Sequence, residues 1–146
     1  MYRSILIPID LDEPDSWKTV FATASSIADC FSAKVTICSV VSDAEAIRHG
    51  QWLPISVEER MFDARARLEG IAASGALPGC HVEVASGTIA GGILRIAERV
   101  RADLVILASH QPGVGDYLRA ANAIRVARRA PCSVLIARST GPERHA

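Results

Sequence analysis

The sequence predicts a doubly wound α/β domain, in which helices cover both faces of a parallel sheet. Short continuous apolar runs of strand length recur along the chain. Between them, apolar residues recur at spacings of three and four, the period of a helix with one buried face. The chain has 146 residues, enough to bury one core. Strands that alternate with helices in this way pair in parallel through right-handed crossovers, so we expect a single domain over residues 1–146.

The first elements are a strand, a helix and a second strand. Ser4–Ile9 is a continuous apolar run, as expected of a strand covered on both faces. Residues 14–31 have helical spacing, and Lys34–Val41 is a second apolar strand. The apolar positions of the helix are Trp17, Val20, Phe21, Ala24, Ile27, Ala28 and Phe31. Residues 42–55 are the least regular part of the chain, and we expect a long loop or a short helix over one sheet edge.

The middle of the chain continues the alternation. Ser56, followed three residues later by Glu59, is a capping box and predicts a helix over 56–74. His81–Ala85 is a β-branched strand, and Ile89–Arg101 is the next helix. We expect four side chains of that helix to face the core, those of Ile93, Ile96, Ala97 and Val100.

The last third contains two strands around one helix. Asp103–Leu107 is the fourth apolar run and Ser133–Ala137 the fifth. Asp116–Arg129 is predicted as the helix between them, and Pro131 helps to define its end. We expect residues 139–146 to form a disordered tail.

The composition excludes several classes of partner. Hydrophobic residues make up 49% and charged residues 22% of the chain, and the formal net charge is zero. No global basic field therefore recruits nucleic acid or acidic lipid. The late basic residues are interpreted as a solvated helix face; they are Arg119, Arg125, Arg128 and Arg129. The apolar run near the amino terminus is too short for a signal sequence or a membrane span, so we expect a cytoplasmic protein without membrane association.

The cysteines indicate a reduced protein without a metal site. Cys30, Cys38, Cys80 and Cys132 are widely spaced, with no CxxC pair. Cys38 and Cys132 lie in or beside apolar runs, which predicts buried thiols. The four histidines do not cluster with the cysteines, whereas a zinc site needs clustered ligands.

Candidate binding residues follow the predicted strands, because ligands bind at the carboxyl ends of strands in open α/β sheets. Asp10 ends the first strand. Two interpretations are open for it: a carboxylate that binds a ribose hydroxyl or a metal-bound phosphate, and a residue that forms a turn or caps a helix. Ser39, Val40 and Val41 end the second strand, where exposed backbone can pair with an adenine edge.

The loop from Ala108 to Gly115 is the main candidate for an anion site, since it leads from a strand into a helix start. The small residues Ala108 and Ser109 allow close backbone approach, and Gly113 and Gly115 add flexibility. His110 either donates to a phosphate or holds a neighbouring loop. The patterns GxxxxGK[ST], GxGxxG and GxSxG are missing from the sequence. The loop therefore indicates a binding site before a catalytic one.

Four segments together resemble the universal stress protein family. They are ILIPID (5–10), KVTICSVV (34–41), ADLVILASH (102–110) and APCSVLIAR (130–138). The resemblance covers residues 2–138 and is greatest to the small stand-alone bacterial members. It implies a stress-response protein with a three-layer sandwich of the adenine nucleotide alpha-hydrolase-like type. It also implies a five-stranded parallel sheet of order 3-2-1-4-5 and a homodimer joined through Ser133–Ala137.

The family's glycine-rich ATP pattern is altered here. Its first glycine corresponds to Ala108 and its second to Gln111, and its Gly-Ser pair falls on Ala120 and Ala121 after a loop one residue shorter. Gln111 places a side chain where backbone usually approaches phosphate, and Ala121 lacks the usual hydroxyl. Loss of one neutral hydrogen bond costs about 0.5–1.5 kcal/mol. Gly113, Gly115 and the following helix start can form a displaced cradle.

The nucleoside half of the family's site is better preserved. By resemblance, Pro8, Ile9 and Asp10 line the ribose and adenine, and Val40 offers its backbone to the base. The resemblance places further contacts at Ser39, Leu107, Ser109, His110, Asn122 and the residues of the glycine-rich pattern. We therefore expect ATP, ADP or AMP to bind, with Mg²⁺ beside it and weakened phosphate contacts.

Other functions stay open beside this one. The altered loop also suits a dimer that has lost nucleotide binding and acts through protein contacts. Catalysis is limited to slow ATP hydrolysis or self-phosphorylation, because no convincing base or P-loop lysine is present. A flavin site is disfavoured, because no aromatic residue precedes Asp116 in the loop after Ala108.

Overall fold

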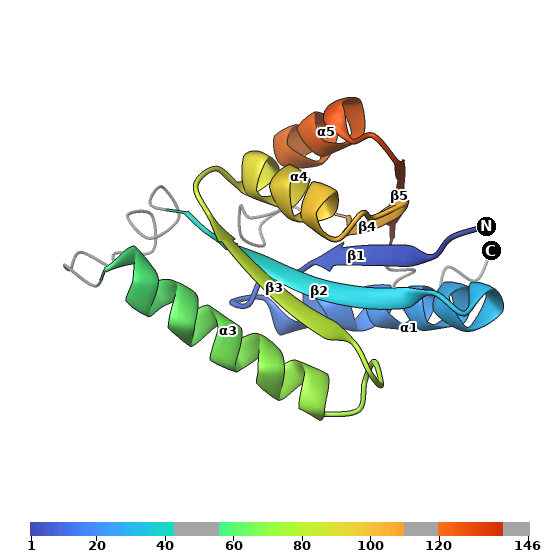
Figure 1. Cartoon of the computed structure of the whole chain (residues 1–146), viewed down its shortest axis with the longest axis horizontal. Coiled ribbons are helices and arrows are strands. Elements are labelled where there is room, and N and C mark those ends of the chain that lie inside the picture. The colour runs from blue at the N-terminus through green and yellow to red at the C-terminus, as the bar shows by residue number, and fades with distance from the viewer. Residues whose placement is uncertain (43–55, 110–119, 139–146) are drawn as a thin grey trace, which may run out of the picture.

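Five parallel strands form one sheet in the computed structural model, which describes residues 1–42, 56–109 and 120–138 (Figure 1). The strands are β1 (Ser4–Pro8), β2 (Lys34–Val41), β3 (His81–Ser86), β4 (Leu104–Ala108) and β5 (Ser133–Ala137). Their order is β3-β2-β1-β4-β5. This confirms the predicted α/β class and the strand order implied by the resemblance.

Helices from the described ranges cover both faces of the sheet (Figure 1). Helices α1 (Pro14–Phe31) and α3 (Val57–Ala73) lie on one face, and α4 (Ile89–Arg99) and α5 (Ala120–Arg129) lie on the other. The central strands are therefore covered on both sides, which explains their continuous apolar sequences. Their fully buried side chains include Ile5, Leu6, Ile7, Ile37, Val105, Ile106 and Leu107.

The element boundaries differ slightly from the expected ones. The Ser56 hydroxyl accepts a hydrogen bond from the Glu59 amide at 3.1 Å, so the predicted cap is present. The helix expected to reach Arg101 ends at Arg99, because Arg101 adopts a left-handed conformation with φ of 52°. The last helix is described from Ala120, and its expected start at residues 116–119 lies outside the described residues, as do residues 43–55 and the tail 139–146.

Phe31 and Cys132 are less buried than their patterns suggested. Phe31 is 38% exposed, and its ring meets the Tyr2 ring edge-on with centroids 5.6 Å apart. The reason is its place as the last residue of α1, directly before the C-cap Ser32. Cys132 is half-buried, because it precedes β5, a strand at the edge of the sheet.

Asp103 ties the amino ends of β1 and β4 together. Its carboxylate accepts hydrogen bonds from the amides of Arg3 and Ser4 at 2.8 and 3.0 Å. The Asp103 amide donates to the Ser4 carbonyl at 2.9 Å, and the Ser4 hydroxyl donates to the Val100 carbonyl at 3.0 Å. These bonds fix the spacing of the two central strands at the edge opposite the expected site.

None of the helices in the described ranges has the length and apolar character needed to cross a membrane.

Candidate functional site

Strands β1 and β4 stop pairing before they reach their carboxyl ends. In their register, Ile5 pairs with Leu104 and Leu6 pairs with Val105. In contrast, β1 pairs with β2 as far as Pro8, and β4 pairs with β5 as far as Ala108. The chain leaves β1 toward β2 and enters β4 from β3, so this is the point where the winding direction changes. Ligands of open α/β sheets bind at such switch points.

Pro8 gives a physical reason for the end of this ladder. The next amide, that of Ile9, donates to the Cys38 carbonyl of β2 at 2.9 Å. Backbone nitrogens alternate between the two sides of a strand, so the nitrogen of Pro8 faces β4. Proline has no N–H to donate, and the pairing toward β4 cannot continue there. Pro8 therefore acts through its backbone, a role that the resemblance did not assign to it.

The chain turns sharply immediately after β1. The half-buried Asp10 accepts the Asp12 amide on Oδ1 at 3.0 Å, and its carbonyl accepts the Glu13 amide at 3.1 Å. This is the geometry of a side chain that supports its own turn. The turn interpretation of Asp10 is thus confirmed, and the turn keeps the residue at the carboxyl end of β1. Its contact with a ribose stays a prediction.

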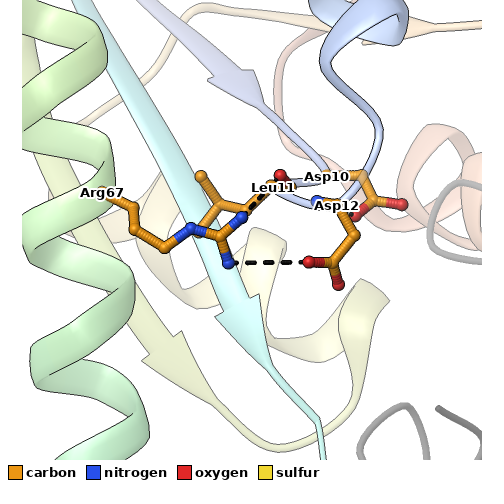
Figure 2. Close-up of polar contacts among 4 residues, drawn as sticks. All are labelled: Asp10, Leu11, Asp12 and Arg67. Atoms are coloured by element: carbon orange, nitrogen blue, oxygen red, sulfur yellow. Dashed lines mark hydrogen bonds and ion pairs between the residues drawn. The ribbon is translucent and has the colours of Figure 1, made fainter.

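A residue of α3 holds the same turn. Arg67 Nη2 donates to the Leu11 carbonyl at 2.8 Å, and Nη1 lies 3.5 Å from Asp12 Oδ1. Figure 2 shows the guanidinium reaching from α3 to the loop that follows Asp10. The sequence analysis missed Arg67, because 56 residues separate it from Leu11 and no local pattern marks the contact.

The end of β2 is buried and lies beside the start of α4. Ser39 and Val40 are both buried, and the Val41 carbonyl accepts the Gly87 amide at 3.0 Å. Thr88 then caps α4, because its hydroxyl accepts the Gly91 amide at 3.2 Å. The amino end of α4 therefore lies at the same edge of the sheet as Asp10. A Thr preceding an apolar helical run is a cap signal that the sequence analysis did not use.

The end of β4 is buried and is hydrogen-bonded to β5. Leu107 and Ala108 are buried, and the Ser109 amide donates to the Ala137 carbonyl of β5 at 2.8 Å. The Ser109 amide is therefore used within the sheet, so it is not the group that would donate to a ligand. In the first turn of α5, Ala121 is exposed and Asn122 is half-buried. Four expected site residues lie outside the described residues: His110, Gln111, Gly113 and Gly115.

The thiol closest to this edge is a core group rather than a nucleophile. Cys38 lies opposite Pro8 in the β1–β2 register and is fully buried. Burial raises its pKa far above the ordinary value, and the nearby Glu83 carboxylate raises the pKa further. The neutral thiol is therefore the form present at physiological pH. Within the described parts of the chain, His, Cys, Asp and Glu do not gather in groups of three that could hold a metal ion.

Solved structures share this architecture. A crystal structure of the hypothetical protein PH0823 matches with a TM-score of 0.73 at 20% identity, over 98% of this chain and 100% of that one. A universal stress protein in complex with cAMP matches with a TM-score of 0.62 at 22% identity, over 93% and 97%. UspA from Lactobacillus plantarum matches with a TM-score of 0.62 at 24% identity, over 92% and 97%.

The family model for the universal stress protein family matches residues 1–138, nearly the whole chain. This match agrees with the strand order and with the placement of the switch point between β1 and β4. The chain belongs to the universal stress protein family.

Proposed function

We propose that this universal stress protein binds an adenine nucleotide at the carboxyl edge of the sheet, where β1 and β4 separate. The carrying observation is the early end of the β1–β4 ladder after Leu6 and Val105, with the Asp10 turn at the same edge. A structural relative with the same fold was crystallised with cAMP, which supports an adenine nucleotide as the ligand class.

The nucleoside is held by the better preserved half of the site. The Pro8 and Ile9 side chains are buried, so this stretch meets the adenine and ribose through its backbone. The Asp10 carboxylate accepts a ribose hydroxyl. The Val40 backbone pairs with the base. A carboxylate that accepts a hydroxyl contributes about 1.5–3 kcal/mol to binding, so Asp10 is the largest single polar contact in this proposal.

The phosphates are held less tightly, and Mg²⁺ accompanies them. Gln111 stands where the family's pattern has glycine, and Ala121 lacks the hydroxyl of the Gly-Ser pair. The Ser109 amide already donates to Ala137. Each phosphate therefore adds less affinity than it gains in a complete glycine-rich cradle.

Isothermal titration with adenosine, AMP, ADP and ATP tests this function. We expect binding of all four, with less than about tenfold gain in affinity from adenosine to ATP. Asp10→Asn keeps an acceptor for the turn and removes the charge, and it should weaken adenosine binding about tenfold. Asp15→Asn, on the exposed first turn of α1, is the control. No heat and no thermal shift at millimolar nucleotide would contradict the proposal.

A second function rests on the exposed edge of the sheet. In β5, Ile136 is 43% exposed, and Ile124 on the neighbouring α5 is 55% exposed. We propose that β5 joins two copies into a homodimer, as an apolar edge strand favours. A dimer without nucleotide that acts through protein contacts is the competing function. The absorbance of fresh protein at 260 nm separates the two, because a co-purified nucleotide raises it.

A further inference from the structure

An apolar groove lies between α1 and α3 and reaches the β1–α1 turn. It has a volume of about 780 Å³, and its lining includes Leu11, Trp17, Phe21 and Ile71. Leu11 belongs to the turn itself and lines this groove, and its carbonyl accepts a hydrogen bond from Arg67. The turn that presents Asp10 is thus bonded to α3 through the Leu11 carbonyl and lies at one end of a groove that α3 helps to line.

Arg67 holds the turn through two neighbouring acceptors. One guanidinium nitrogen donates a hydrogen bond to the Leu11 carbonyl, and another forms an ion pair with the Asp12 carboxylate (Figure 2). The Asp12 amide in turn donates to the Asp10 carboxylate, so these contacts form a continuous path from α3 to Asp10. A planar guanidinium can serve two acceptors at once, whereas a lysine ammonium is a point charge on a flexible stem.

The ion pair between Arg67 and Asp12 contributes too little to the folding free energy to explain its role by stability alone. The Arg67 and Asp12 side chains are 46% and 58% exposed, and ion pairs at such positions add little to the folding free energy. A contact of this kind acts mainly by limiting the conformations of the turn. Binding a ligand to a turn that is already ordered avoids the entropic cost of ordering it.

We propose that Arg67 is a positioning residue for the nucleotide site, which orders the Asp10–Asp12 turn from α3. This inference rests on the proposed function and names a residue on which that site depends. Arg67 acts through the turn and does not itself contact the nucleotide. The geometry assigns to it the orientation of the Asp10 carboxylate before the ligand arrives.

The chain offers a matched control in Lys18. It lines the same groove, but its ammonium pairs at 3.5 Å with Asp15 within α1. Arg67→Met and Lys18→Met each remove one positive charge from the groove and keep an unbranched apolar stem. Only the first removes donors from the turn. Arg67→Lys keeps the charge and tests the need for two donors.

Two measurements on the full chain test the proposal. Amide hydrogen exchange by NMR, without ligand, reports the order of the turn through the Asp12 and Glu13 amides, which donate to Asp10. Titration with adenosine reports the site. We expect Arg67→Met to speed exchange of both amides and to weaken adenosine binding by about three- to tenfold. Arg67→Lys should lie between Arg67→Met and wild type, and Lys18→Met should match wild type.

The outcomes separate the two proposals. Exchange in Arg67→Met that equals exchange in Lys18→Met would overturn the ordering role, whatever the protein binds. Faster exchange with an unchanged adenosine Kd would overturn the role in binding. If wild type binds no adenosine, the proposed function fails and the binding role fails with it, while the exchange data still decide whether Arg67 orders the turn.

Discussion

Gly92 of α4 packs directly against Val40 of β2. A Cβ atom built on Gly92 would lie 2.6 Å from both Cγ atoms of Val40, closer than any ordinary contact. Glycine is needed here for close approach, since the Val40 side chain leaves no room for a methyl group. The contact sets the distance between α4 and the end of β2, next to the backbone proposed to meet the base.

Gly92→Ala should therefore destabilise the fold. Alanine normally stabilises a helix interior by about 0.5–1 kcal/mol relative to glycine. Here overpacking against the buried Val40 should outweigh this gain and cost about 1–3 kcal/mol net. Gly70→Ala in α3 is the control, because a Cβ there meets nothing within 4 Å and should stabilise. Urea denaturation of both variants checks the prediction, and shifts of the same sign would contradict it.

Asp103→Ala should loosen the amino ends of β1 and β4. The substitution leaves the Arg3 and Ser4 amides without their carboxylate acceptor, and we expect a loss of about 2–3 kcal/mol in the free energy of unfolding. Asp103→Asn keeps one carbonyl oxygen and should lose about half as much. Equal losses in both variants would show that charge, not the pair of acceptors, is what matters.

Local patterns predicted the elements well, because each strand and helix carries its own signal. Apolar runs marked the strands, and Ser56 with Glu59 marked a helix start that the structure confirms. The strand order came from the resemblance, since periodicity alone does not order strands. Arg67 with Leu11 and Gly92 with Val40 could not be predicted, because such contacts depend on how distant elements pack together.

The candidate site also has features that the sequence predicts locally and features that depend on how distant elements pack. Asp10 was expected at the end of β1 with two possible roles, and its bond to the Asp12 amide identifies one of them. The role of Pro8 in ending the ladder depends on which side of the strand its nitrogen faces. That side follows from the register with β2, which the sequence does not contain.

Cys38 should make stability fall at alkaline pH. Burial raises the folded-state pKa of this thiol, whereas the unfolded thiol ionises near 9.0. Its contribution is thus fully present below pH 9.0 and is lost as pH rises toward the folded pKa. The slope approaches 1.4 kcal/mol per pH unit. The stability difference between wild type and Cys38→Ala should be constant from pH 7 to 8 and shrink above 9.0. A constant difference up to pH 10.5 would contradict the assignment.

Ile136→Glu should dissociate the proposed homodimer. A carboxylate at this exposed position of β5 places like charges close together across a two-fold axis and removes apolar contact. Sedimentation velocity should show a dimer for wild type and a monomer for the variant. Phe62→Glu is the control, because Phe62 is 78% exposed on α3, which packs against β2 and β3 at the opposite edge of the sheet. A monomeric wild type would contradict the interface.

Restoring the Gly-Ser pair should strengthen phosphate binding selectively. Ala120→Gly with Ala121→Ser returns a small backbone and a hydroxyl to the start of α5. One neutral hydrogen bond corresponds to about three- to tenfold in affinity, so the ATP Kd should fall by that factor while the adenosine Kd stays unchanged. Ala127→Ser, exposed at the far end of α5, is the control. An equal gain for adenosine would place the new contact outside the phosphate region. No gain for either ligand would assign the weakness to Gln111 and the shortened loop, because these would still keep the triphosphate away from the restored hydroxyl.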